Sequence, residues 1–168
     1  MPTGNPTPTF RTLDPREVEQ LLARHNVGRI AYTFHGRVDI EPIHYVYPDG
    51  AIYMRTAPGS KLAALAHAPW IALEVDEVDG LFDWRSVVAH GTVYVLRDDG
   101  PPVERESYRQ AVAYLRTLVP GALGDGDPTP ERTVVLKVRP DELTGREART
   151  AMPARHSLGD ATGEVTPP

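Results

Sequence analysis

Residues 51–66 read Ala-Ile-Tyr-Met-Arg-Thr-Ala-Pro-Gly-Ser-Lys-Leu-Ala-Ala-Leu-Ala, a pattern of strand, turn and helix start. The apolar run ends in Arg55 and Thr56, and a Pro-Gly turn follows. Ser60 and Lys61 then open a helical run. Backbone N–H groups at the start of a helix lack partners and carry partial positive charge, so they suit a phosphate group. This turn, with its two cations and two hydroxyl groups, predicts a phosphate site.

The amino-acid composition of the chain is that of one ordinary globular domain. The chain has 168 residues, 40% hydrophobic and 24% charged residues, and a formal net charge of -5. Among its 18 basic residues only Lys61 and Lys137 are lysines, so a lysine in the turn is not a product of composition. The acidic balance argues against a nucleic-acid partner, because phosphate neutralisation needs a basic face.

Several other classes of protein are disfavoured. There is no cysteine, so the chain has no disulfide framework, thiolate metal site or Cys nucleophile. The histidines lack the spacing of metal ligands, so no metal is predicted. No signal-peptide pattern or membrane span is visible, and we expect no membrane partner and a cytoplasmic location.

The hydrophobic pattern predicts three helices. The first follows Asp14 as N-cap, with Pro15 at the first helical position and Glu17 completing a capping box. The second covers residues 60–67, and the third begins at Pro101 or Pro102 and ends near residue 119.

Strand patterns dominate the rest of the chain. The predicted strands are 27–34, 37–47, 51–56, 70–78, 84–97 and 133–139, with Gly91 as a bulge. Short connections without helical crossovers join the first three, so the sheet is expected to be antiparallel and the fold class α+β. Residues 13–148 form the predicted domain, and residues 1–12 and 149–168 are expected to be disordered tails.

With these segments placed, the chain resembles the flavin-binding split-barrel family, the pyridoxamine 5′-phosphate oxidase-like proteins, over about residues 14–147. The segments that carry the resemblance are Val27–Ala31, Ile52–Thr56, Gly59–Lys61, Val75–Glu77, Trp84–Gly91 and Val138–Arg146. Within this family the chain is similar to the nitroimidazole-resistance branch. It departs from that branch at Arg55, where many members carry His.

The resemblance implies a six-stranded antiparallel split β-barrel with flanking helices. It also implies a homodimer that binds an FMN in each of two clefts between the subunits. By position, Arg55 and Lys61 would bind the FMN phosphate, with contacts from Thr56 and Ser60. The residues expected close to the flavin ring are Trp84, Ser86 and the backbone near Val87.

His44 is a further candidate for the cofactor site. It shares a strand face with Val38, Ile40 and Val46, which is typical of a hydrogen-bonded core histidine. The functional alternative places it near the flavin or the substrate, where it donates a proton. A haem-binding variant needs only one axial histidine, and His44 or His90 fits that role.

The leading hypothesis is therefore an FMN-dependent oxidoreductase that acts on a small-molecule substrate, with NAD(P)H as a candidate electron donor. No residue is identified as catalytic, because the flavin supplies the reactivity. The alternatives are a flavin-binding module without turnover, a deazaflavin or haem in the same fold, and a cofactor-free dimeric interaction domain.

Overall fold

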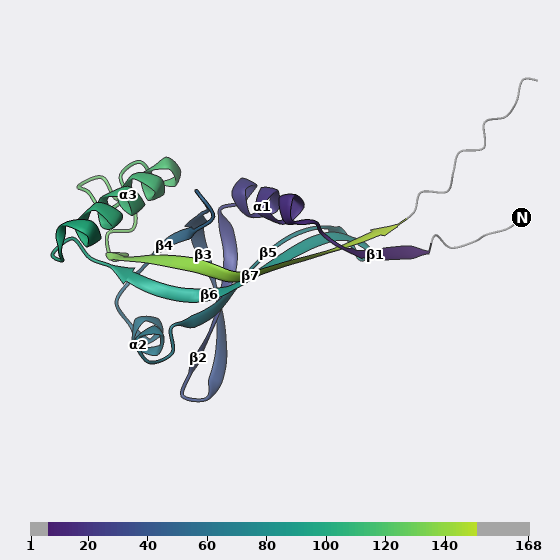
Figure 1. The fold of residues 1–168 in the computed structure, drawn as a ribbon, viewed down its shortest axis with the longest axis horizontal. Helices are drawn as coiled ribbons and strands as arrows, with labels where there is room; N and C mark the ends of the chain where they lie inside the picture. Colours follow the sequence, from purple (N-terminus) through teal and green to yellow (C-terminus); the bar gives the residue numbers. More distant parts are fainter. Residues whose placement is uncertain (1–6, 151–168) are drawn as a thin grey trace, which may run out of the picture.

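The computed structural model describes residues 7–150, and its centre is a closed antiparallel β-barrel (Figure 1). The six barrel strands are β2 (Val27–Phe34), β3 (Arg37–Val46), β4 (Ile52–Thr56), β5 (Trp70–Gly80), β6 (Asp83–Leu96) and β7 (Val134–Thr150). They are hydrogen-bonded in the order β7-β4-β3-β2-β5-β6, and a further pairing of β6 with β7 closes the ring. The predicted α+β class and six-stranded antiparallel barrel are confirmed.

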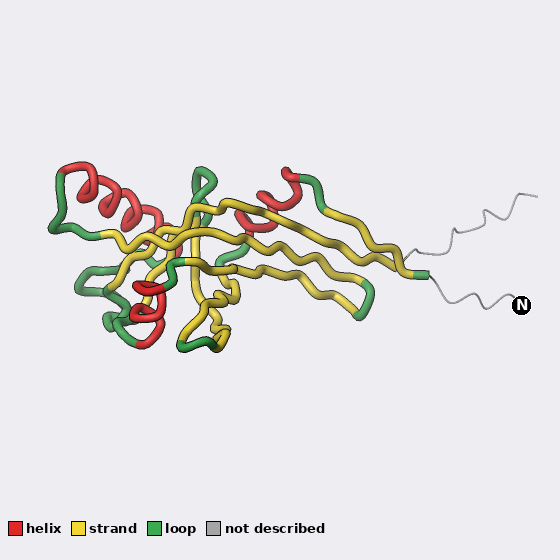
Figure 2. Tube along the Cα trace, turned by 60° about the horizontal axis from the view of Figure 1, so that its bottom comes forward, coloured by secondary structure: helices red, strands yellow, loops and turns green. Residues whose placement is uncertain are grey.

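A seventh strand, β1 (Pro8–Thr12), lies outside the ring. It pairs antiparallel with residues 146–150 at the end of β7. Figure 2 shows these two strands side by side at one end of the molecule. Residues 8–12 thus form a strand although the sequence predicted a disordered tail, because backbone pairing with β7 needs no apolar periodicity. Residues 149–150, predicted to start the second disordered tail, are likewise the end of β7 and pair with β1. Residues 1–6 and 151–168 lie outside the described residues.

Strand β7 is much longer than the predicted 133–139. Its first half pairs with β4 on one side and β6 on the other, and its second half pairs with β6 and β1. Pro140 lies at a register shift opposite Gly91, where one residue of β7 has no partner. A bulge tolerates the missing N–H of proline, so the strand continues past it.

Three helices flank the barrel: α1 (Pro15–Arg24), α2 (Ser60–His67) and α3 (Pro102–Leu118). The capping box of α1 is present as predicted: Asp14 accepts a hydrogen bond from Glu17 N, and Glu17 accepts one from Asp14 N, both at 2.9 Å. Figure 1 shows α3 at one end of the long axis and α2 on the opposite side of the sheet from α1. No helix in residues 7–150 is long and apolar enough to cross a membrane.

Two apolar clusters stabilise this arrangement. The larger fills the barrel and includes Tyr45, Met54 and Leu73, each with an exposed fraction of 0%. The smaller lies between α3 and the outer face of β4 and β7, around Tyr53 and Leu115. Because successive residues of a strand point to opposite faces, β4 contributes to both clusters. This double burial accounts for the full burial of its five residues.

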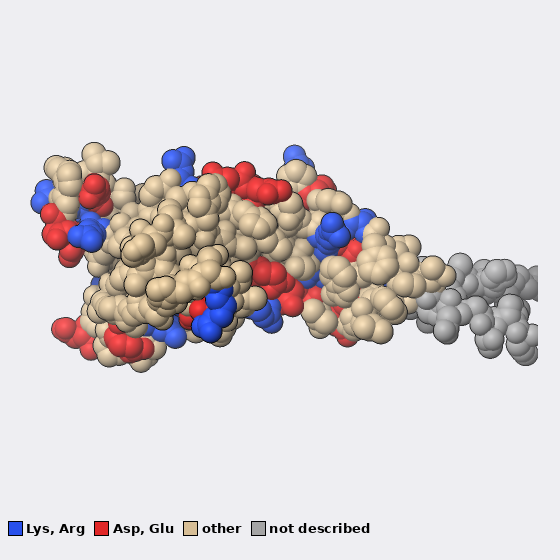
Figure 3. Space-filling model, turned by 90° about the horizontal axis from the view of Figure 1, so that it is seen from below, with Lys and Arg blue, Asp and Glu red and all other residues tan. Residues whose placement is uncertain are grey.

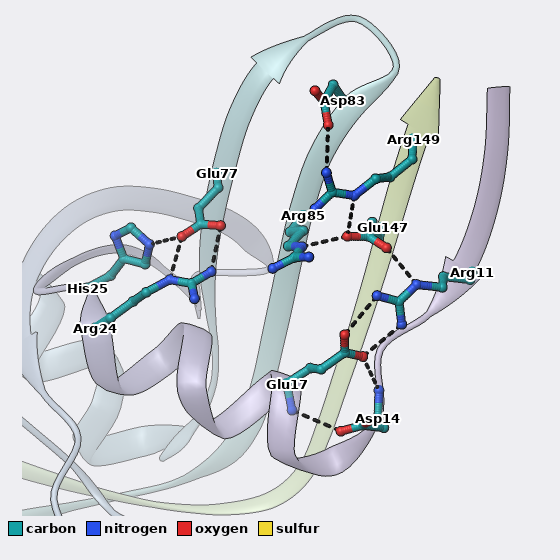
Figure 4. A network of polar contacts seen from close by, with 10 residues as sticks. All are labelled: Arg11, Asp14, Glu17, Arg24, His25, Glu77, Asp83, Arg85, Glu147 and Arg149. Carbon is teal, nitrogen blue, oxygen red and sulfur yellow. Dashed lines mark hydrogen bonds and ion pairs between the residues drawn. The ribbon is translucent and has the colours of Figure 1, made fainter. Parts of the chain in front are cut away.

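A network of ion pairs holds β1 and α1 to the barrel (Figure 4). The buried carboxylate of Glu147 accepts hydrogen bonds from Arg11, Arg85 and Arg149 at 2.5, 2.6 and 2.9 Å. Burial opposes ionisation of Glu147, but these three hydrogen bonds lower its pKa. In the same region Glu77 binds both Arg24 and His25 at the end of α1. The network fixes the position of the β6 and β7 ends.

Candidate functional site

The turn between β4 and α2 leaves the start of the helix open. Gly59 is the N-cap, and no side chain bonds to the free N–H groups there. A Cβ added at Gly59 would meet no atom within 4 Å. Ser60, an alternative N-cap in the sequence pattern, is instead the first helical residue, and it is exposed. Free N–H groups, an exposed hydroxyl and adjacent open space are the features that a phosphate group needs.

Lys61 lies beside this helix start and is held by a carboxylate. Its Nζ is 2.8 Å from Oε2 of Glu41 on β3, and its side chain has an exposed fraction of 13%. Tyr32 of β2 donates its hydroxyl hydrogen to the other oxygen of Glu41. Burial and this hydrogen bond raise the pKa of Tyr32 to about 12, so the phenol stays protonated and remains the donor.

Arg55 is buried in an ion pair with a residue that lies 72 positions later. Its guanidinium donates to both oxygens of Asp127, one at 2.8 Å, and to Oγ1 of Thr129 at 2.8 Å. Only 7% of the Arg55 side chain and 3% of the Asp127 side chain are exposed. Asp127 also accepts hydrogen bonds from the N–H groups of Leu123 and Thr129, and together these contacts lower its pKa.

The two predicted phosphate cations therefore belong to different surroundings. Arg55 shares its face of β4 with Tyr53, which packs under α3. Lys61 binds Glu41, which lies on the barrel-core face of β3 together with Tyr45. Thr56 is buried at the end of β4 between them. Each of the two cations is already paired with a carboxylate, Lys61 with Glu41 and Arg55 with Asp127, and the start of α2 adds free N–H groups beside Lys61. The role of each residue as a cofactor ligand stays a prediction.

The residues predicted near a flavin ring lie on the open face of β6. Trp84 and Ser86 line a cavity of about 190 Å³, and Val87 points the other way into the barrel core. Arg146 of β7 is opposite Ser86 and lines the same cavity. Among residues 7–150 no carboxylate lies within ion-pair distance of Arg146. This face therefore joins an aromatic ring, a hydroxyl and a cation at one opening.

His44 is exposed on the outer face of β3 rather than buried in the barrel. It lines a small cavity of about 160 Å³ with Arg55, Arg132 and the end of α3. The structure therefore brings His44 close to Arg55. Among the described residues no group of three or more His, Asp or Glu side chains is arranged to hold a metal ion.

The sequence profile of the pyridoxamine 5′-phosphate oxidase family matches residues 14–147, most of the chain. The chain belongs to this family. Among solved structures, it is similar to an FAD-binding protein from Mesorhizobium loti. The two are 25% identical with a TM-score of 0.65, over 82% of this chain and 96% of that one. Family membership agrees with the barrel topology and with the motifs quoted above.

Two more distant structures have the same fold. One is a candidate 5-nitroimidazole antibiotic resistance protein from Bacteroides thetaiotaomicron, 18% identical with a TM-score of 0.64 over 84% of this chain and 89% of that one. The other is the haem storage protein of Vibrio cholerae, 14% identical with a TM-score of 0.57 over 76% and 89%. At these identities the likeness shows the fold alone. A search of curated proteins finds no significant match.

Four polar residues that matter at this site were not among the sequence candidates: Tyr32, Glu41, Asp127 and Arg146. Glu41 lies between Ile40 and Pro42, and a charged residue between apolar neighbours in a strand is typically solvent-facing. Tyr32 shares its strand face with Ile30 and Phe34, so its ordinary interpretation is a core residue. Asp127 lies in a Gly- and Pro-rich loop where a turn role is the ordinary interpretation. Only Arg146 had a usable signal, since it belongs to the last segment that resembles the family.

Proposed function

We propose that the protein binds a flavin nucleotide, with FMN as the cofactor, and acts as an oxidoreductase on a small-molecule substrate. The observation that carries the proposal is the start of α2, where Ser60 and Lys61 border N–H groups to which no side chain bonds. Membership of the pyridoxamine 5′-phosphate oxidase family and the likeness to an FAD-binding protein support it. In this proposal Lys61 anchors the phosphate by a charge-assisted hydrogen bond.

The cavity beside Trp84 and Ser86 is the proposed place for the ring system. Trp84 offers an aromatic surface, and the Ser86 hydroxyl is fixed by donating to Glu74 at 2.8 Å. Arg146 is the cation available at this opening, and its charge would favour the anionic form of a reduced flavin. When bound, the flavin supplies hydride or electron transfer, and the chain's own residues bind and orient it.

We also propose that the ring site is completed by a second copy of the chain. The outer face of β2, β3 and β5 exposes large apolar side chains: Val27, Val38, Ile40 and Trp70 are each 55% to 65% exposed. Figure 3 shows one face of the molecule with a broad uncharged area between small mixed patches of both signs. Exposed apolar surface of this extent is typical of an interaction site.

A homodimer predicts a mass in solution twice the 18.5 kDa of the chain. Sedimentation equilibrium of the full-length protein measures this mass. Changing Ile40 to Asp places a charge in the proposed interface and should shift the population to the monomer. A wild-type protein that stays monomeric at micromolar concentration would contradict the dimer.

The flavin proposal is tested by absorption spectra and by titration with FMN and riboflavin. We expect the wild type to bind FMN and the variant Lys61→Ala to bind it roughly 10- to 100-fold more weakly, since one charge-assisted hydrogen bond is lost. Riboflavin, which has no phosphate, should bind both proteins equally. Lys137→Ala is the matched control, because the other lysine of the chain lies over the Tyr53 ring.

The outcomes separate the competing functions. FMN binding that is unchanged in Lys61→Ala would contradict the phosphate site. A deazaflavin-like absorption band or a Soret band in the purified protein would indicate that a deazaflavin or a haem, rather than FMN, binds to this fold. A bound flavin that NAD(P)H does not reduce and that an added acceptor does not reoxidise would indicate a flavin-binding module without turnover.

A further inference from the structure

Lys61 does not present a free positive charge at the start of α2. Its ammonium group forms a 2.8 Å ion pair with Glu41, whose other oxygen accepts the hydroxyl hydrogen of Tyr32. Tyr32 is only 5% exposed, and the Lys61 side chain is 13% exposed. Glu41, with 41% of its side chain exposed, is the member of the three that faces water. The carboxylate is therefore accessible to a ligand that approaches Lys61.

The other charges around this group do not offset Glu41. Asp39 lies two residues earlier on the same face of β3 and binds Arg37 at 3.3 Å. Arg55, the other candidate phosphate cation, is neutralised by Asp127. Each of these cations is therefore already paired with a carboxylate before any ligand binds. An approaching phosphate meets a lysine whose charge is already satisfied.

We propose that Glu41 competes with the ligand's phosphate for Lys61 and so determines how much negative charge the start of α2 accepts. The inference rests on the proposed function, because it concerns the same anion site. A phosphate that takes Lys61 must displace the carboxylate, which then stays close by as a like charge. Tyr32 holds that carboxylate near the lysine and so keeps the competitor in place.

The competition has a consequence for the class of ligand. A phosphate monoester carries a charge of about -1.5 to -2 at neutral pH, whereas each phosphate of a diester carries one negative charge. Repulsion from Glu41 grows with the charge of the phosphate. Neutralising Glu41 should therefore raise the affinity for FMN, a monoester, more than the affinity for FAD, whose pyrophosphate carries one negative charge on each phosphate.

The test titrates inorganic phosphate into the full-length protein. NMR signals of the Ser60, Lys61 and Leu62 amide groups report the binding. Glu41→Gln removes the charge and keeps the shape of the side chain. Asp39→Asn removes the same charge two residues away without a contact to Lys61, so it is the matched control. We expect phosphate to bind Glu41→Gln about 5- to 10-fold more tightly than the wild type. Asp39→Asn should change the affinity less than twofold.

FMN and FAD titrations of the same proteins complete the test. Glu41→Gln should gain more affinity for FMN than for FAD and none for riboflavin. Equal or weaker phosphate binding in Glu41→Gln, or the same gain in Asp39→Asn, would overturn the proposal. If phosphate responds as expected but no flavin binds, the proposed function fails and the role of Glu41 stands. If flavins bind through Lys61 and Glu41→Gln changes no affinity, the proposed function stands and the role of Glu41 fails.

A pH series with FAD gives a second signature, because its pyrophosphate group does not titrate in the range used. Partial burial favours the protonated form of Glu41, but hydrogen bonds from Lys61 and Tyr32 lower its pKa in the free protein. A phosphate that takes Lys61 removes that stabilisation, so the complex binds a proton more readily than the free protein does. Affinity for FAD should therefore rise as the pH falls from 7.5 to 4.5 in the wild type and stay level in Glu41→Gln.

Discussion

Replacing Asp127 by Ala is expected to lower the melting temperature by roughly 10 °C, because it leaves the buried guanidinium of Arg55 without its counter-ion. The native carboxylate accepts two hydrogen bonds from Arg55 and one each from the N–H groups of Leu123 and Thr129. The substitution thus leaves four donors unsatisfied inside the protein. A buried charge without a partner is among the most destabilising defects that one mutation can create.

Differential scanning calorimetry of the variant measures this loss. Asp125→Ala is the matched control, since that carboxylate lies two residues away in the same loop and is exposed. The double variant Arg55→Met with Asp127→Leu removes both charges and should regain a large part of the lost stability. A melting temperature within 2 °C of the wild type in Asp127→Ala would contradict a structural role for the pair.

The lowered pKa of Asp127 determines whether this ion pair makes the protein more or less stable as the pH falls. A carboxyl group whose pKa is lower in the folded state stabilises the protein above its unfolded pKa. That contribution is lost as the pH falls through the folded pKa. Wild-type stability should therefore fall more steeply under acid than that of the double variant, which lacks the carboxylate.

Replacing Gly91 by Ala is expected to destabilise the protein by about 3 kcal/mol, at the upper end for overpacking in a closely packed region. A Cβ at this position would lie 2.2 Å from the carbonyl oxygen of Arg139 and 3.0 Å from Cα of Pro140. Both are backbone atoms of β7, so no side-chain rotation relieves the contact. The strands must separate at the bulge where β6 and β7 close the barrel.

Urea denaturation followed by tryptophan fluorescence gives the change in unfolding free energy. Gly126→Ala serves as the control, because its added Cβ would meet no atom within 4 Å. We expect that control to stay within about 1 kcal/mol of the wild type. If Gly91→Ala were equally mild, the close approach of β7 at the bulge would not be a rigid feature of the barrel.

Local patterns of the sequence determined most of the secondary structure. The capping box at Asp14 and Glu17 places the first turn of α1, because its hydrogen bonds join residues three positions apart. The bounds of β2 and α2 coincide with the predicted residues 27–34 and 60–67, since turn residues and a change of period mark both. Gly91 was likewise visible as the place of an irregularity, because a glycine inside a strand pattern is a local signal. The structure puts the extra residue in β7, opposite Gly91.

The strand β1 and the second half of β7 had no comparable signal. Residues 8–12 are mostly exposed, and residues 140–150 begin with a proline and contain a glycine. Their strand structure comes from pairing with each other and with β6. Hydrogen bonds of this kind use the backbone, so they leave little trace in the order of side chains.

The sequence by itself identified the turn that we propose as a phosphate site, because the residue types at Ser60 and Lys61 and the helix that follows are local features. Only the tertiary structure decided which carboxylates neutralise the two candidate cations. It pairs Arg55 with Asp127 across 72 positions and Lys61 with Glu41 from another strand. Electrostatic energy depends on distance in space rather than along the chain, so the partners of the two cations become known only when the barrel closes.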